Sequence, residues 1–465
     1  MPDSTLVFAS ATELGKLLRK KKISSVELTR LFLKRLETLG PTYNALAELT
    51  PELALVQARK ADRALAKGTA SSPLTGIPYG AKDLLATKGI PTRWGAPQYK
   101  DQVPDYDATV IIKMREAGAV LAAKLAMVEL AGGGGYAHAS ASLHGPGLNP
   151  WNLKHWAGGS SSGSGSAVAA GLVPFALGSE TWGSIVTPSA YCGISGLRPT
   201  WGYVSRYGAM ELAWSMDKVG PMARSAEDCG WVLQAIAGFD LNDDTTIEDG
   251  FSFKPRISRR DFQLGVLPLD YSENPETEKA FEEAVRVLRS AGMKLSRTEL
   301  PKHDYEVFTR TMLNGEMAAA HKALIESGRV DELVDAPQAQ GLKDSLKITA
   351  ADYVLAQQTQ IGASLDLLKM FQKFDALVAP TLLMEAPSLD TNLQTAFKRR
   401  GGYSVLGASS GVPCLTVPMG FGPKGLPLGL AFTGDLFDEQ TILEIGMAFQ
   451  RETDWHLMHP VETSP

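Results

Sequence analysis

The spacing of apolar residues near the N-terminus predicts helices. Apolar residues recur every three or four positions between 11 and 39, and Ser24 and Glu27 stand at the spacing of a capping box, so two helices are expected in this range. Residues 52–67 are rich in Ala and Leu and predict a third helix. These segments carry no candidate catalytic side chain, and we interpret them as packing elements.

Further along the chain, apolar runs of strand length alternate with helical patterns. Strands are expected at 172–177, 263–267, 293–299, 374–381, 412–417 and 427–432, and helices at 167–170, 275–291, 304–372 and 438–451. Residues 107–125 predict a helix, a stop at Gly118 and then a short strand. This alternation is typical of an α/β sheet. Because no internal repeat or linker interrupts the chain, we interpret residues 1–465 as one domain.

The composition narrows the class of protein. With 44% hydrophobic and 21% charged residues it is ordinary for a globular protein, and a net charge of −5 gives no electrostatic basis for binding nucleic acid or an anionic membrane. No apolar run reaches the length of about 18 residues that spans a membrane. The three cysteines lie far apart, which favours a reducing cytoplasm over a disulfide framework. The seven histidines form no ligand motif, so neither a metal nor another cofactor is expected.

The stretch from Gly158 to Ser184 carries the strongest candidate chemistry. Ser160 and Ser184 each stand beside glycines, where backbone N–H groups can approach a ligand closely. Such donors around a serine hydroxyl suit acyl transfer, in which negative charge develops on a carbonyl oxygen. A flexible Gly/Ser linker is the alternative, but a helical pattern and an apolar run follow the serines, so the turn is expected to be part of a core.

A second candidate is Lys82, which lies inside a strand-like run of small and apolar residues. Burial would lower the pKa of its amine and favour the neutral form, which accepts a proton. A structural ion pair with Asp83 or an exposed edge position explains the residue equally well. The four glycines 132–135 are similarly ambiguous, since they fit either a hinge or one wall of a pocket.

With these residues in hand, the chain resembles the amidase signature family over about residues 11–450. The resemblance rests on the following segments: G-I-P-Y-G-A-K-D-L around Lys82, N-P-W at 149–151, G-G-S-S at 158–161, G-S-I at 183–185, C-G-I-S-G-L-R-P-T at 192–200, F-D-A-L-V-A-P-T at 374–381 and G-L-P-L-G-L at 425–430. It implies a fold around a large mixed β-sheet flanked by helices on both faces. The helical stretch 304–372 is then expected to cap the site.

The resemblance also assigns roles. It implies a Ser–cis-Ser–Lys triad, with Ser184 as the nucleophile, Ser160 as the bridging serine on a cis peptide bond, and Lys82 as the base. The backbone N–H groups of Thr181, Trp182, Gly183 and Ser184 would form the oxyanion hole, and Gly134 falls near a substrate-contacting backbone position. The implied reaction is hydrolysis of a small amide, without a cofactor. A carbamate or an ester is an alternative substrate for the same triad.

The sequence departs from the usual family pattern at several positions. Ser162 replaces a glycine, and Val186 replaces the arginine expected to pair with an acidic residue, so Glu180 needs another partner, for which Arg198 is a candidate. Trp182 is expected to narrow or line the pocket. These changes argue against the amidotransferase branch of the family.

Two other readings stay open. Gly159–Gly163 fits the G-x-S-x-G motif of an α/β-hydrolase, but residues 152–157 do not form the apolar strand required before it. That reading also needs a later histidine, for which only His303, His321, His456 and His459 are available. From a different class, the chain could be a non-catalytic binding or assembly protein on the same scaffold. The oligomeric state is undetermined, with a homodimer as the working expectation.

Overall fold

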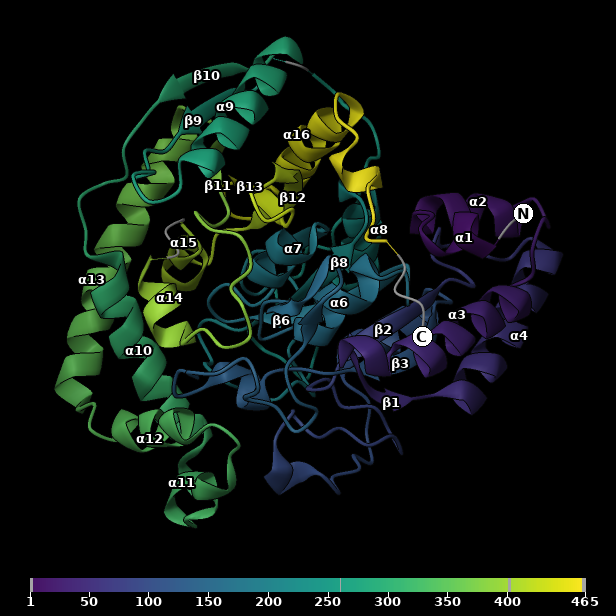
Figure 1. The fold of residues 1–465 in the computed structure, drawn as a ribbon, viewed down its shortest axis with the longest axis horizontal. Helices are drawn as coiled ribbons and strands as arrows, with labels where there is room; N and C mark the ends of the chain where they lie inside the picture. Colours follow the sequence, from purple (N-terminus) through teal and green to yellow (C-terminus); the bar gives the residue numbers. More distant parts are fainter. Residues whose placement is uncertain (1–2, 260, 400–402, 462–465) are drawn as a thin grey trace.

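A mixed β-sheet forms the centre of the fold (Figure 1). The computed structural model describes residues 3–259, 261–399 and 403–461, and within them the sheet has 11 strands. Their order is β1 (Leu46–Leu49), β3 (Val120–Leu125), β2 (Pro78–Lys82), β6 (Phe175–Glu180), β8 (Lys218–Ala223), β7 (Ser195–Arg198), β12 (Cys414–Phe421), β13 (Pro427–Thr433), β11 (Ala376–Pro380), β9 (Gln263–Val266) and β10 (Lys294–Arg297). Strands β3, β2 and β6 run parallel, as do β11, β9 and β10, and the pairs between these groups are antiparallel.

Helices surround the sheet. They are α1 (Asp3–Val7), α2 (Ala11–Arg19), α3 (Ser25–Leu39), α4 (Pro51–Lys67), α5 (Thr109–Glu116), α6 (Ser162–Ala169), α7 (Val186–Cys192), α8 (Ala226–Ile236), α9 (Pro275–Ser290), α10 (Tyr305–Ala320), α11 (Lys322–Glu326), α12 (Ala336–Ser345), α13 (Ala350–Leu368), α14 (Leu393–Arg399), α15 (Val405–Ser410) and α16 (Glu439–Arg451). In the described part of the chain, no helix combines the length and the apolar character needed to cross a membrane.

The alternation of side chains along β6 shows that helices cover both faces of the sheet. Successive side chains of a strand point to opposite faces. Phe175 and Leu177 belong to the apolar cluster that includes α8, α9 and α16, whereas Ala176 belongs to the cluster that includes α6 and α7. The expected α/β architecture, a large mixed sheet between two helical layers, is therefore confirmed.

Local sequence signals account for the N-terminal helices. Both expected helices in 11–39 are present, and each begins with a capping box, Ser10 with Glu13 in α2 and Ser24 with Glu27 in α3. In a capping box the serine and the acidic side chain satisfy backbone N–H groups that the first helical turn leaves unpaired. The helices expected at 52–67, 275–291 and 438–451 are also confirmed, to within one residue at each end.

Some expectations need correction. The strand expected at 172–177 begins only at Phe175, because Pro174 has no N–H for the ladder and the preceding residues form a turn. The sequence pattern predicts neither β7 nor β8, which lie at the middle of the sheet. Residues 152–156 do form a strand, β5 (Asn152–Trp156), but it lies outside the main sheet, where it pairs with β4 (Leu148–Asn149) and forms an isolated bridge from His155 to Ser388.

Candidate active site

Lys82 ends strand β2 and lies inside the protein. Its side chain is fully buried, and Nζ donates hydrogen bonds to Ser160 Oγ at 2.7 Å and to Ser179 Oγ at 2.9 Å. Ser179 lies on β6, which pairs in parallel with β2, so the sheet itself brings these two residues together. The structure therefore joins Lys82 directly to one of the two serines singled out in the sequence.

The environment of Lys82 favours the neutral amine. Burial lowers the pKa of Lys82 to about 7, and the negative charges of Asp217 and Glu180 only partly oppose this effect. The alternative ion pair with Asp83 is not formed. Asp83 instead lies 3.4 Å from Nζ of Lys124, another fully buried lysine. Lys82 is thus a buried lysine, and among the residues that the structure describes no carboxylate pairs with it directly.

The serine turn lies between β5 and α6 and contacts the turn that carries Ser184. Ser160 and Ser161 are both buried, and the peptide bond between Gly159 and Ser160 is cis. Ser161 N–H donates to the carbonyl oxygen of Ser184 at 3.4 Å, which joins the two turns. Ser161 Oγ also donates to the carbonyl oxygen of Ser179. The run of Ser and Gly is therefore an ordered part of the core, and the flexible-linker reading is wrong.

The turn from Thr181 to Ser184 joins β6 to α7. Gly183 adopts a φ of +96°, a left-handed conformation that favours glycine. Thr181 Oγ1 donates to Asp217 Oδ1 at 2.5 Å, which anchors the start of the turn. Among the hydrogen bonds of residues 3–259, 261–399 and 403–461, none uses the backbone N–H groups of Trp182, Gly183 or Ser184. The turn can therefore offer these donors to a ligand.

A buried ion pair holds the other side of this turn. Glu180 Oε1 lies 2.7 Å from Arg198 Nη1, and both side chains are fully buried. Glu180 Oε2 accepts hydrogen bonds from the N–H groups of Ile185 and Val186. Burial alone would raise the pKa of Glu180, but the Arg198 guanidinium and the hydrogen bonds outweigh it, and the pKa is lowered. The expectation that Arg198 replaces the missing arginine partner is confirmed.

We expect Glu180→Gln to destabilise the fold by about 3–5 kcal/mol, because removing one charge leaves the other buried without its counter-ion. Urea unfolding followed by tryptophan fluorescence measures this change. The matched control is Glu276→Gln, which breaks the exposed pair with Lys279 and should cost about 1 kcal/mol or less. Equal effects of the two substitutions would contradict this account of the ion pair.

The four glycines lie on a loop that packs against the helical stretch 304–372. Gly134 has a φ of +90°, and its N–H contacts Met317 Sδ of α10 at 2.8 Å. A Cβ at Gly134 would lie 2.2 Å from the carbonyl oxygen of Gln338 in α12, so the position accepts only glycine. The segment that precedes this loop contacts the serine turn, because Val128 N–H donates to the carbonyl oxygen of Ser160. The described contacts of Gly134 itself are with α10 and α12.

The structure adds residues that the sequence did not point out. Ser179 and Asp217 contact Lys82 and Thr181 respectively, and Lys218 is a further buried lysine. Burial lowers the pKa of Lys218 to about 7, but its Nζ donates to the carbonyl oxygen of Gly407. A polar residue at the end of an apolar run was the available signal for Ser179. Asp217 and Lys218 come to the site through the pairing of β8 with β6, which cannot be predicted from the local sequence pattern.

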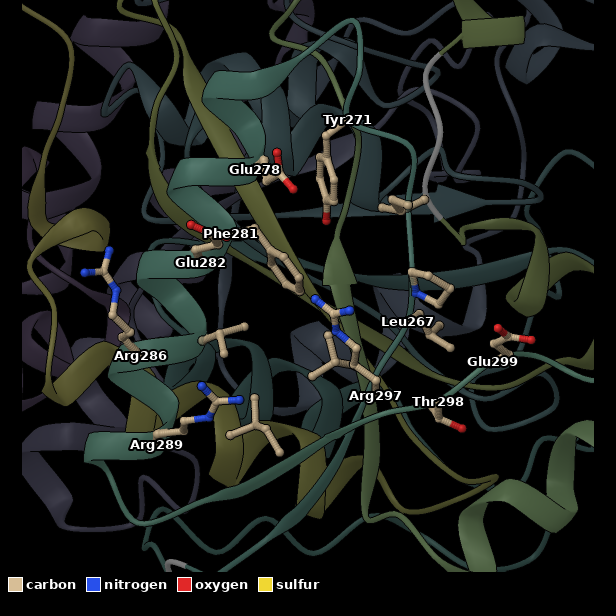
Figure 2. A pocket seen from close by; sticks show the side chains of 15 residues that line it. Leu267, Tyr271, Glu278, Phe281, Glu282, Arg286, Arg289, Arg297, Thr298 and Glu299 are labelled. Atoms are coloured by element: carbon tan, nitrogen blue, oxygen red, sulfur yellow. The ribbon is translucent and has the colours of Figure 1, made fainter.

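Of two cavities in the structure, only the smaller one is lined by residues near Lys82. One of about 220 Å³ is lined by Ser179, Thr181, Asp217 and Lys218 together with residues from 206–214 and 242–244, so it reaches the strand ends beside Lys82. A larger one, of about 860 Å³, lies between α9 and the ends of β9 and β10 (Figure 2). None of the candidate site residues lines this larger hollow, and size alone therefore does not locate the chemistry.

The α/β-hydrolase reading finds no support in the fold. The strand before Ser160 lies in the separate ribbon β4–β5, with no place in the main sheet. Within the described residues, no hydrogen bond joins one of the later histidines to Ser160. His303 pairs with Asp366, His459 stacks on Phe8, and burial lowers the pKa of His321 to about 4. The three cysteines are free and buried, and burial raises the pKa of Cys192, as expected for an inert thiol.

A buried lysine that is hydrogen-bonded to a buried serine, beside a mixed sheet with this strand order, is the arrangement that the resemblance to amidase signature hydrolases leads us to expect. The chain matches the Amidase family model over residues 27–443, and it belongs to the amidase signature family. The expected family is thereby confirmed.

Individual relatives extend this result. The chain is 36% identical to the A subunit of the glutamyl-tRNA(Gln) amidotransferase of Geobacter metallireducens, over 96% of this chain and 97% of that protein. It is also 36% identical to the protein of the same name from Coxiella burnetii, over 96% and 98%. Among solved structures, the native peptide amidase of Stenotrophomonas maltophilia is 31% identical, with a TM-score of 0.85 over 95% of this chain and 96% of that one.

Proposed function

We propose that the chain hydrolyses a carboxylic amide through an acyl-enzyme on Ser184, releasing a carboxylate and an amine or ammonia. The observation that carries the proposal is the 2.7 Å contact between Lys82 Nζ and Ser160 Oγ inside a fully buried environment. A serine hydroxyl is a weak nucleophile without an adjacent base. A buried lysine with a pKa of about 7 supplies that base near neutral pH.

In the proposed acylation step, protons move along the chain of three side chains. Neutral Lys82 accepts the proton of Ser160 Oγ, and Ser160 Oγ accepts the proton of Ser184 Oγ as the latter attacks the amide carbonyl carbon. Negative charge then develops on the carbonyl oxygen, where the N–H groups of Thr181, Trp182, Gly183 and Ser184 would stabilise it. These donors are held by the Gly183 turn and by the Glu180 contacts described above.

The attack of Ser184 Oγ on the carbonyl carbon gives a tetrahedral intermediate. When this intermediate collapses, the C–N bond breaks. The protons return along the same path, from Lys82 to Ser160 and from Ser160 to the departing nitrogen, so that the amine leaves in its neutral form. Water then attacks the ester on Ser184 with the same residues acting as base, and Ser184 is regenerated with release of the carboxylate. Lys82 and Ser160 therefore act as a base when the nucleophile attacks and as an acid when the leaving group departs.

We propose that Trp182 selects the acyl group that becomes attached to Ser184. Its ring lies under the guanidinium of Arg310 in α10, with 5.2 Å between Cζ and the ring centroid. Helices α10 and α12 contact the Gly134 loop as well. We infer that residues 304–372 cap the site and that Trp182 forms one wall of it. Carbamates and esters stay open as alternative substrates of the same triad.

A second candidate function has a specific observation in its favour. The relatives at 36% identity are named as the A subunit of an amidotransferase, so the alternative function is that of a subunit in a larger amidotransferase assembly. The departures at Trp182 and Val186 argue against this branch. The 31% identity to a peptide amidase, with a TM-score of 0.85, supports the hydrolase.

The test is a panel of aryl, aliphatic and peptide C-terminal amides, with glutamine, a carbamate and an ester, given to the isolated chain. We expect carboxylate and amine to be released without a partner protein. We also expect Trp182→Gly to change the relative rates among acyl groups by about tenfold, because a contact in a hydrophobic pocket contributes about 1–3 kcal/mol of discrimination.

Trp455→Gly is the matched control, since that ring packs on Phe421 outside the candidate site. It should alter all rates by a common factor. Activity only on glutamine, and only with added partner proteins, would favour the amidotransferase function instead. If Trp182→Gly changed the rates for all substrates equally, the proposed role of Trp182 in selecting the acyl group would be wrong. That result would not contradict the proposed amide hydrolysis.

A further inference from the structure

A further cavity lies where the first turns of α2 and α8 meet the end of α16 and the segment that follows it (Figure 1). Its volume is about 250 Å³, and four basic side chains line it, those of Lys16, Arg224, Arg451 and His456. None of the candidate catalytic residues lines this cavity. The proposed amide hydrolysis therefore does not account for the basic residues gathered there.

Arg224, directly after β8, is buried at this cavity without a counter-ion. Its side chain belongs to a residue that is only 6% exposed, and in the described part of the chain no carboxylate lies within ion-pair distance of it. Burial lowers the pKa of Arg224 to about 10, and the more distant Asp228 and Glu13 oppose this effect only in part. The guanidinium thus stays charged at neutral pH. Because a buried charge is costly unless it is paired, the cavity beside Arg224 is suited to an anion.

The guanidinium of Arg224 has donors available for such an anion. Nη2 donates to the carbonyl oxygens of His456 and Met458 at 3.4 and 3.2 Å, and Cζ lies 5.3 Å from the centroid of the Phe8 ring. Among the hydrogen bonds of the described residues, none uses Nε or Nη1 of Arg224. A guanidinium presents its N–H groups as a rigid fork that matches two oxygens of a carboxylate or a phosphate.

His456 is a second group in the cavity that lacks a partner. Its Nδ1 is buried, and within residues 3–259, 261–399 and 403–461 no hydrogen bond reaches this atom. Burial and the positive charge of Arg224 lower the pKa of His456, so the ring is neutral at neutral pH. A neutral imidazole carries its proton on either ring nitrogen. With the proton on Nδ1, His456 can donate to an anion in the cavity that Arg224 also lines.

The remaining charges favour an anion over a cation. Lys16 and Arg451 are exposed residues at the rim, and neither forms an ion pair with another described residue. Glu13 and Glu227 line the cavity as well, but each lies in the first turn of a helix, where a carboxylate opposes the positive end of the helix dipole. The three cations Lys16, Arg224 and Arg451 outnumber these two carboxylates, so the lining has a net positive charge.

We propose that this cavity binds one small tetrahedral oxyanion, either inorganic phosphate or the phosphate group of a small monoester. Its donors come from α2, from the residue after β8 and from the segment after α16, and donors on several sides suit a tetrahedral ion better than a planar carboxylate. One water molecule takes about 30 Å³ of liquid volume, so the cavity has room for an ion several times larger. The bound ion would join the N-terminal and C-terminal parts of the fold. This inference does not depend on the proposed reaction.

The test is isothermal titration of the full chain with inorganic phosphate at pH 7, with sodium chloride keeping the ionic strength constant. We expect saturable binding of one phosphate per chain with a Kd of about 1 mM or lower. Glycerol 3-phosphate is titrated in the same way to separate the two sources of the group. Tighter binding of the ester identifies a phosphate monoester as the ligand, and tighter binding of inorganic phosphate identifies the free ion. Absence of saturable binding by both would overturn the proposal.

Two variants locate the bound ion. Arg224→Met should abolish saturable binding, with circular dichroism and amide hydrolysis as checks of folding, because Arg224 also holds the segment at His456. Lys16→Gln changes only an exposed side chain and should weaken phosphate binding by about five- to tenfold, through loss of a charge-assisted contact. Lys20→Gln is the matched control, since this lysine is equally exposed at the end of α2 but lies outside the cavity, and it should bind as the wild type does.

These variants also define the contrary results. If folded Arg224→Met bound phosphate as tightly as the wild type, the ion would lie elsewhere and the proposal would be wrong. Equal affinities of Lys16→Gln and Lys20→Gln would overturn it in the same way, because a bound ion that senses only the overall charge of the protein does not occupy this cavity.

Discussion

Replacing Ser184 by alanine is expected to lower kcat/KM for an amide substrate by about 10⁴-fold or more, because the variant lacks the oxygen that forms the acyl-enzyme. The fold should be unaffected, since Ser184 contacts its surroundings through its backbone carbonyl, which accepts from Ser161 N–H. Initial rates of amine release, measured with wild type and variant at equal concentration, give the ratio directly.

The control for this loss is Ser140→Ala, which changes an exposed serine on the loop that follows the four glycines. It should retain wild-type kcat/KM within a factor of about two, as expected for a surface position. If Ser184→Ala kept more than a tenth of the wild-type activity, the nucleophile would have to be another serine, with Ser161 as the first candidate because it lies in the adjoining turn.

Replacing Lys82 by methionine is expected to lower kcat/KM by about 10²- to 10⁴-fold, the usual contribution of a general base. In the wild type, only the neutral amine can accept the proton of Ser160. Because burial lowers the pKa of Lys82 to about 7, kcat/KM should rise as the pH increases through that value and then level off. The variant should lose this ionisation from its pH profile.

Lys218→Met provides a demanding control, since Lys218 is also buried and also has a pKa lowered to about 7. Its Nζ donates to a backbone carbonyl oxygen and contacts neither serine in the structure. The Lys218 variant should therefore keep the ionisation near pH 7 in kcat/KM. A wild-type profile that is flat between about pH 6 and pH 10, or loss of the ionisation in Lys218→Met alone, would argue against Lys82 as the base.

The sequence was a good guide to the fold where local signals agree with the final structure. The capping boxes at Ser10 and Ser24 act within one helical turn, so their helices could be predicted from neighbouring residues alone. Strands β7 and β8 escaped prediction because Gly196, Gly220 and Pro221 interrupt their apolar pattern. A Cβ at Gly196 would lie 2.0 Å from Ser189 Oγ, so close packing of α7 on the sheet determines that residue.

The same distinction applies to the candidate site. Lys82, Ser160 and Ser184 stand in motifs whose residue types carry their own chemical meaning, so the sequence alone predicts them as candidate site residues. Ser179 and Asp217 became evident only in the structure. Ser179 reaches Lys82 because β6 pairs with β2, and Asp217 reaches Thr181 because β8 pairs with β6. These contacts depend on the order of strands in the sheet, which the local pattern of the chain does not specify.

The central claim, that Ser184 is an activated nucleophile, is tested most directly by the intact mass of the protein after treatment with a fluorophosphonate. This reagent forms a covalent bond with the oxygen of an activated serine and releases fluoride. The account predicts one adduct per chain on the wild type at neutral pH and none on Ser184→Ala. An adduct of equal extent on Ser184→Ala would contradict it and would place the reactive oxygen on another residue.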